Sequence, residues 1–227
     1  MRRFWQFGLP VIAVACIAYG GYVGLFVAPP EVFMGDVYRI MFVHVPTAWV
    51  AMIGSLINFG ASLYYLFRPS QKADALAESA AEVGVVFATL LLITGSIWGR
   101  PTWGVWWTWD PRLTTAAIMW LAYSGYLALR KFVDVPEKRA TWAAVVGIIV
   151  FVDVPIVWFS VKWWNSLHQT QSSPKALGSE MRQALYFNAL AFTLLFAWFT
   201  YLRFGIARRR QAEEMTAPPA LNAGEAA

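Results

Sequence analysis

The chain has 227 residues, of which 59% are hydrophobic and 14% are charged. Soluble domains are roughly 45–50% apolar and about 25% charged, so this composition excludes a water-soluble globular protein and an intrinsically disordered one. The single cysteine, Cys16, excludes an internal disulfide framework, a cysteine-based zinc site and an iron–sulfur cluster. Because no Cys-x-x-Cys-His sequence occurs, the chain is not itself a c-type cytochrome.

Apolar stretches long enough to cross a membrane recur along the chain. A bilayer core about 30 Å thick needs roughly 20 apolar residues per helix. Six predicted spans follow, at residues 7–28, 46–67, 83–98, 113–129, 142–159 and 184–202. They form one membrane domain, residues 1–210, and the Ala-, Pro- and Glu-rich tail 211–227 is predicted to be disordered. The expected fold class is an all-α integral membrane protein, since no stretch shows the two-residue alternation of a β-barrel.

The N-terminus and the basic residues give the expected orientation. Arg2 and Arg3 before an apolar run resemble the start of a signal peptide, but the run continues past Cys16 to Ala28, so we expect a retained first span. With six spans both termini share one side, which carries 12 of the 18 lysines and arginines. The positive-inside rule therefore places both termini in the cytoplasm. The net charge of +5 is explained by this bias, and no nucleic-acid partner is expected.

Both histidines of the chain fall in predicted outer loops. His44 ends the first outer loop and His168 lies in the third. The middle outer loop carries a dense aromatic segment, made of Trp103, Trp106, Trp107, Trp109 and the adjoining Asp110. The spacing i, i+3, i+4 and i+7 from Trp103 to Asp110 predicts a short helix lying in the membrane interface, although Gly104, Pro101 and Pro111 make that helix marginal. A flat, π-rich surface of this kind suits a large planar ligand.

This combination favours haem as the ligand. A six-coordinate haem iron takes one axial ligand on each face, and neutral imidazole is a good iron ligand. The porphyrin carries two carboxylates at one rim, which basic side chains of the outer loops could bind. The candidates for that contact are Arg100, Arg112, Lys162 and Arg39.

Each of these residues also has a plainer interpretation. A histidine at a membrane edge is often just an interfacial polar residue, and a tryptophan-rich loop is often a membrane anchor. Asp110 stands before Pro111 and could simply cap the fourth span, while Arg112 could bind a lipid phosphate. Asp153, inside the fifth span and next to Pro155, predicts a kinked helix with a polar network whose partner the sequence does not identify.

Three segments resemble one known family. Residues Trp103 to Thr114 resemble the tryptophan-rich WWD signature of haem-handling proteins. The settings of the histidines, Phe42 to Pro46 and Trp163 to Gln169, resemble those in the smaller, six-span branch of that group. That branch is the cytochrome c maturation protein C (CcmC) family, also called haem exporter protein C, and the resemblance covers nearly the whole chain except the tail.

The resemblance implies a haem-delivery component of the bacterial inner membrane rather than an enzyme. His44 and His168 would be axial ligands of transiently bound haem b at the periplasmic face, and Trp103 to Asp110 would present the haem to the periplasmic chaperone CcmE. CcmA, CcmB and CcmD are the implied membrane partners, and any ATP use would belong to them because the chain lacks a nucleotide-binding loop. A b-type cytochrome subunit and a secondary transporter stay open as alternatives.

Overall fold

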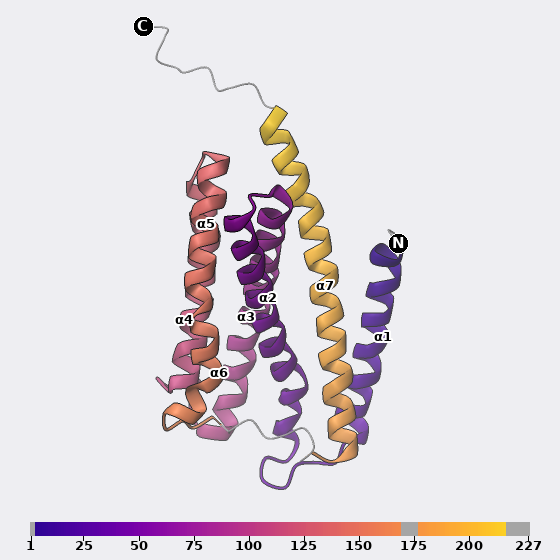
Figure 1. The fold of residues 1–227 in the computed structure, drawn as a ribbon. Helices are drawn as coiled ribbons and strands as arrows, with labels where there is room; N and C mark the ends of the chain where they lie inside the picture. Colours follow the sequence, from indigo (N-terminus) through magenta and orange to yellow (C-terminus); the bar gives the residue numbers. More distant parts are fainter. Residues whose placement is uncertain (1–2, 169–176, 217–227) are drawn as a thin grey trace, which may run out of the picture.

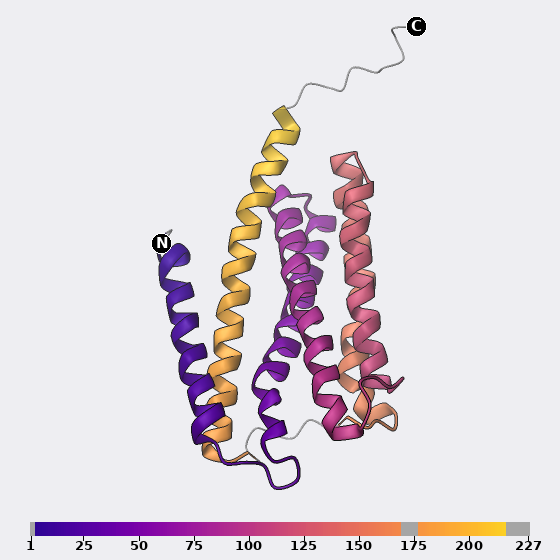
Figure 2. The same cartoon turned by 180° about the vertical axis from the view of Figure 1, so that it is seen from behind.

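The computed structural model describes residues 3–168 and 177–216, and these residues are almost entirely helical (Figures 1 and 2). The described part of the chain contains no β-strand, only an isolated bridge between Glu31 and Gly35. The α-helices are α1 (Leu9–Tyr22), α2 (Met41–Phe67), α3 (Gln71–Trp103), α4 (Pro111–Phe132), α5 (Pro136–Phe151), α6 (Asp153–Trp163) and α7 (Ser179–Thr216). Short helical turns extend α1 at both ends, at Phe4–Gly8 and Val23–Val27, and precede α2 at Asp36–Ile40.

Five helical segments are long and apolar enough to cross a membrane: Phe4–Val27, Asp36–Phe67, Gln71–Trp103, Pro136–Trp163 and Ser179–Thr216. They make the chain an all-helical, multi-pass membrane protein. Helix α4 covers the remaining predicted span, 113–129, and runs alongside α5 (Figure 1), but it is not among the five segments that are apolar enough. A count of six crossings thus depends on α4.

Two predicted boundaries were wrong, and both lie in helical stretches that are rich in charged residues. The third span was expected to begin at residue 83, yet α3 already begins at Gln71. The tail was expected to start at residue 211, yet α7 continues to Thr216, with Glu214 paired to Arg139 at 2.5 Å. In both places ion pairs with other helices stabilise a helix that composition alone does not predict. Residues 217–227 of the predicted tail lie outside the described residues.

The helix is interrupted close to Asp153, where the sequence predicted a kink. Helix α5 ends at Phe151 and α6 begins at Asp153, so the path is interrupted at Val152. Pro155 has no N–H to donate to the carbonyl of Phe151, which removes one helical hydrogen bond at this point. The buried Oδ2 atom of Asp153 has no hydrogen-bond partner among the described residues.

Helices α2 and α3 form the centre of the bundle. They approach closely at a pair of glycines: a Cβ atom on Gly54 would lie 3.0 Å from the Cα atom of Gly84 and 3.1 Å from the carbonyl oxygen of Ala80. Small residues at such a crossing allow the backbones of membrane helices to pack directly. Helix α1 lies outside this centre against α7, as both views show (Figures 1 and 2).

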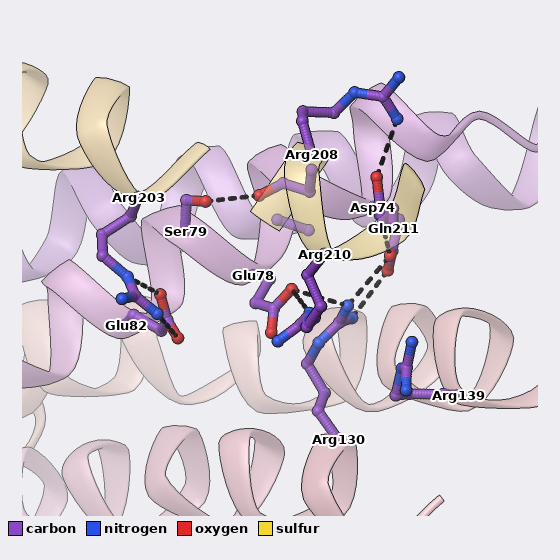
Figure 3. Close-up of polar contacts among 12 residues, drawn as sticks. Asp74, Glu78, Ser79, Glu82, Arg130, Arg139, Arg203, Arg208, Arg210 and Gln211 are labelled. Carbon is purple, nitrogen blue, oxygen red and sulfur yellow. Dashed lines mark hydrogen bonds and ion pairs between the residues drawn. The ribbon is translucent and has the colours of Figure 1, made fainter. Parts of the chain in front are cut away.

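A buried ionic cluster joins α3, α4 and α7 at one end of the bundle (Figure 3). Arg130 of α4 donates to Asp74 at 2.7 Å and to Glu78 at 3.1 Å, and Arg210 of α7 donates to Glu78 at 2.5 Å. Gln211 completes it with a bond to Asp74 at 2.8 Å. Only 3% of the Arg130 side chain is exposed. The cluster thus connects the start of α3 to the end of α4. The tryptophan-rich segment lies at the other end of both helices, between Trp103 and Pro111.

Replacing Arg130 with alanine is expected to destabilise the fold by about 3–5 kcal/mol, because it leaves the buried carboxylate of Asp74 without its cation and removes one of the two arginine partners of Glu78. The change should lower the unfolding temperature in detergent and the yield of folded protein. Arg209→Ala is the matched control, since Arg209 lies on the same turn of α7 as Arg210 but is exposed. Equal unfolding temperatures for the two variants would show that the cluster contributes no stability.

Candidate functional site

The structure brings the two histidines together. His44 lies near the start of α2 and His168 follows the end of α6, and their ring centroids are 6.5 Å apart with the ring planes inclined by 34°. His44 was expected at the end of a loop; it is instead inside α2, which begins three residues earlier at Met41. A helical backbone therefore positions one imidazole, and an irregular segment carries the other.

Helix α3 forms the surroundings of His44. The Nδ1 atom of His44 lies 3.0 Å from the hydroxyl oxygen of Thr94, and the Trp98 ring meets the imidazole edge-on at a centroid distance of 5.5 Å. Gly95 lies against the same ring, where a Cβ atom would be 3.1 Å from Cε1 of His44. His44 is 9% exposed. Sequence reasoning missed Thr94 and Gly95, because nothing in an apolar span marks the face that will meet a histidine.

Asp110 holds the His168 segment in place. As predicted, it caps α4: its Oδ1 atom accepts from the backbone N–H of Arg112 at 2.8 Å. The same carboxylate also accepts from the Ser166 hydroxyl at 3.0 Å and from the backbone N–H of Leu167 at 2.7 Å. The hydroxyl of Ser166 in turn accepts from the backbone N–H of His168 at 3.0 Å. One buried side chain thus caps α4 and fixes the backbone next to His168.

The tryptophan-rich segment is not the interfacial helix that its spacing predicted. Helix α3 ends at Trp103, and Gly104 follows with φ +80°, a left-handed conformation that suits glycine at a helix C-terminus. Residues 104–110 are irregular. The left-handed glycine and the two prolines, Pro101 and Pro111, explain why the helical spacing is not realised.

The tryptophans of this segment therefore point in different directions. Trp103 lies beside His168, with ring centroids 6.4 Å apart. Trp107 packs edge-on against Trp109 at 6.0 Å. The side chains of Trp106 and Trp109 are 59% and 82% exposed. The structure thus places Trp103 against the histidine pair and leaves an exposed aromatic surface next to it.

The two arginines expected to bind carboxylates also hold helix ends. Arg100 donates through Nη1 to the carbonyl of Gly104, at the end of α3. Arg112 donates through Nη1 to the carbonyl of Val157 at 2.7 Å and to that of Trp158 at 3.3 Å, which joins α4 to α6. Both guanidinium groups are thus engaged by backbone carbonyls of the protein itself.

The other two basic candidates are also engaged by the protein. Arg39 donates through Nη2 to the carbonyl of Ala28 at 3.0 Å and pairs with Asp36 at 2.9 Å. The ammonium of Lys162 lies 5.6 Å from the centre of the Phe159 ring. Neither contact brings these residues to the histidine pair.

The donor set at this site suits a metal that brings its own equatorial ligands. Among the described residues no group of three or more histidine, cysteine, aspartate and glutamate side chains could hold a metal ion. Two imidazoles alone are too few for a protein-built zinc or iron site, but they complete the coordination of a porphyrin iron. Rings that bind one metal ion from opposite faces through bonds of about 2 Å have centres roughly 6 Å apart. The observed 6.5 Å matches this spacing.

Fold and site together define a multi-pass helical membrane protein with a tryptophan-flanked histidine pair at one end of its bundle. The family model described as "Heme exporter protein C" matches residues 2–217. The chain belongs to this family, as its motifs indicated.

Similar proteins named heme exporter protein C occur in several bacteria. The Bradyrhizobium diazoefficiens protein is 42% identical over 195 residues, which cover 83% of this chain and 74% of that protein. The Paracoccus denitrificans protein is 38% identical over 88% of this chain and 86% of its own length. The Escherichia coli K12 protein is 33% identical over 86% of this chain and 80% of its own length.

Proposed function

We propose that this chain is a haem-handling component of cytochrome c maturation, which binds haem b transiently by axial coordination from His44 and His168. The observation that carries the proposal is the approach of the only two histidines of the chain to a ring-centre distance of 6.5 Å. They lie 124 residues apart in the sequence, one in α2 and the other in the irregular segment after α6, so a shared ligand is the simplest reason for their proximity. The name of the family, heme exporter protein C, supports the same cargo.

In this proposal the chain's own residues position the haem for transfer. His44 and His168 bind the iron from opposite faces, and Trp103, beside His168, covers part of the porphyrin. The exposed rings of Trp106 and Trp109, with Trp107 packed against Trp109, form the surface that receives the periplasmic chaperone CcmE. Arg100 and Arg112 bind the carboxylates of the porphyrin rim. Release requires at least one imidazole to leave the iron.

The proposed topology has six crossings, with α4 as the sixth, both termini in the cytoplasm and the histidine site at the periplasmic face of the inner membrane. Support comes from the start of α1 and the end of α7, which lie at the same end of the bundle, away from the site (Figure 1). The polar side chains of α4 include Arg130, whose charge is neutralised within the ionic cluster. Such pairing allows a charged residue to lie near the end of a membrane helix.

The proposed partners follow the haem exporter system of this family: the ABC-type subunits CcmA and CcmB and the small protein CcmD. The chain has no Gly-x-x-x-x-Gly-Lys-Ser/Thr sequence, so energy from ATP would have to enter through a partner.

The direct test is the spectrum of the purified protein with ferric haem. We expect low-spin absorption bands typical of two imidazole ligands in both the ferric and the ferrous form. A high-spin spectrum, typical of a five-coordinate iron, would contradict the proposed pair of ligands.

The two alternative functions predict different observations. A b-type cytochrome holds haem within the helix bundle, whereas His44 lies near the start of α2 and His168 follows α6; reversible reduction of the bound haem by a quinol would favour that function. A secondary transporter places its polar site near the membrane midplane, where Asp153 at the α5–α6 break would serve. Accumulation of substrate by vesicles that contain only this chain would favour a transporter.

A further inference from the structure

Thr94 is a polar neighbour of His44 to which the proposed function gives no role. It lies on α3, where its hydroxyl donates to the carbonyl of Leu90 at 2.7 Å. The same oxygen lies 3.0 Å from Nδ1 of His44. A threonine hydroxyl has one proton and two acceptor lone pairs. When this proton stays on the Leu90 carbonyl, the hydroxyl oxygen is the acceptor for His44 and Nδ1 carries the proton of the neutral ring.

We propose that Thr94 is a positioning residue that fixes the tautomer of His44 and thereby presents its Nε2 lone pair to the haem iron. A neutral imidazole has one protonated nitrogen and one with a free lone pair, so a bond that keeps the proton on Nδ1 leaves Nε2 as the metal ligand. Histidines that bind metals generally donate their other N–H to such an outer partner, which orients the ring and raises its basicity. This inference rests on the proposed function.

The packing around His44 fixes the direction of the ring as well as its tautomer. Gly95, the neighbour of Thr94, leaves only enough space for the edge of the ring, since a Cβ atom there would lie 3.1 Å from Cε1 of His44. Trp98, one turn further along α3, meets the ring edge-on at 5.5 Å. Thr94, Gly95 and Trp98 thus form one face of α3 that holds the imidazole. A rotation of the ring would break the Thr94 bond and meet these neighbours.

The tautomer can be measured without haem, because the chain contains only two histidines. Solid-state NMR of the protein labelled with [15N]histidine in lipid should give two sets of ring signals, and His44→Ala identifies the set that belongs to His44. We expect His44 to be protonated at Nδ1 in the wild type and to shift towards the Nε2-protonated form in Thr94→Val. A wild-type His44 protonated at Nε2 would overturn the inference whatever the haem measurements show.

The second test measures ferric haem binding by three threonine variants. Thr94→Val keeps the shape of the side chain and removes the acceptor, and we expect haem affinity to fall by about 10- to 100-fold. Thr94→Ser keeps the hydroxyl and should retain wild-type affinity. Thr193→Val is the matched control, because Thr193 makes the same type of bond to its own helix, to Ala189 at 2.7 Å on α7.

If Thr94 has a purely structural role, Thr94→Val should lower the thermal stability only. The tautomer of His44, the haem affinity of the folded fraction and the reduction potential of bound haem would then be unchanged, and that result would overturn the inference. If His44→Ala and His168→Ala both bind haem like the wild type, the proposed function fails together with this inference. If both histidine variants lose haem while Thr94→Val behaves like Thr193→Val, only the role of Thr94 is contradicted.

Discussion

Replacing both His44 and His168 with alanine is expected to weaken haem binding by more than about 100-fold, since loss of an outer partner of a metal ligand alone costs about 10- to 100-fold. The described residues offer no other cluster of metal-binding side chains that could take over. Each single variant should keep one axial bond and give a high-spin, five-coordinate spectrum. Titration with ferric haem, followed by absorption spectroscopy, measures both effects.

The control for these variants has to separate a lost ligand from a disturbed helix. Trp49→Ala changes an exposed side chain of α2 close to His44 and should leave the haem spectrum unchanged. His44→Gly offers a positive test, because free imidazole can enter the space left by the buried ring and restore the low-spin spectrum. Haem binding by the double alanine variant at wild-type affinity would contradict coordination by this pair.

Replacing Asp110 with alanine is expected to weaken haem binding by about 10- to 100-fold, as for other outer partners of metal ligands. The carboxylate accepts three hydrogen bonds, two of them from the segment that leads to His168. Without it, Ser166 and Leu167 lose their anchor and His168 no longer has a fixed position. A loss of about 1 kcal/mol in folding stability should accompany the change, because Asp110 also caps α4.

A double-variant cycle distinguishes the two roles of Asp110. If the carboxylate acts through His168, Asp110→Ala should weaken haem binding in the wild type and have little further effect in His168→Ala. Ser166→Ala, which keeps the cap of α4 and removes one bond to the segment, should give an intermediate loss of affinity. Asp36→Ala, an exposed carboxylate in another loop, serves as the control. Additive losses for Asp110→Ala and His168→Ala would show that Asp110 does not act through this histidine.

Sequence reasoning found the residues whose chemistry is rare in this chain. With only two histidines, each had to be weighed as a ligand, and Asp110 before Pro111 is a recognisable helix start. The helical class and the kink near Pro155 also followed from composition and from the missing N–H of proline. These features depend on local sequence, so they could be predicted without knowledge of the packing.

The features that sequence reasoning missed depend on which helix faces meet. Thr94 looks like any threonine in a membrane span, and only the rotation of α3 against α2 places its hydroxyl at His44. The charges of residues 71–82 suggested a loop, because their partners Arg130 and Arg210 lie on helices far away in the sequence. The spacing of the tryptophans predicted a helix that Gly104 and the flanking prolines prevent. In each case tertiary contacts or turn residues overrode a local pattern.

Iron itself can be located directly. Anomalous scattering at the iron absorption edge, measured from crystals of the haem-loaded protein grown in lipid, gives the position of the metal independently of the protein electron density. The account predicts a single iron peak between the imidazoles of His44 and His168, within bonding distance of one ring nitrogen from each. An iron peak away from both rings, or bonded to neither of them, would contradict it.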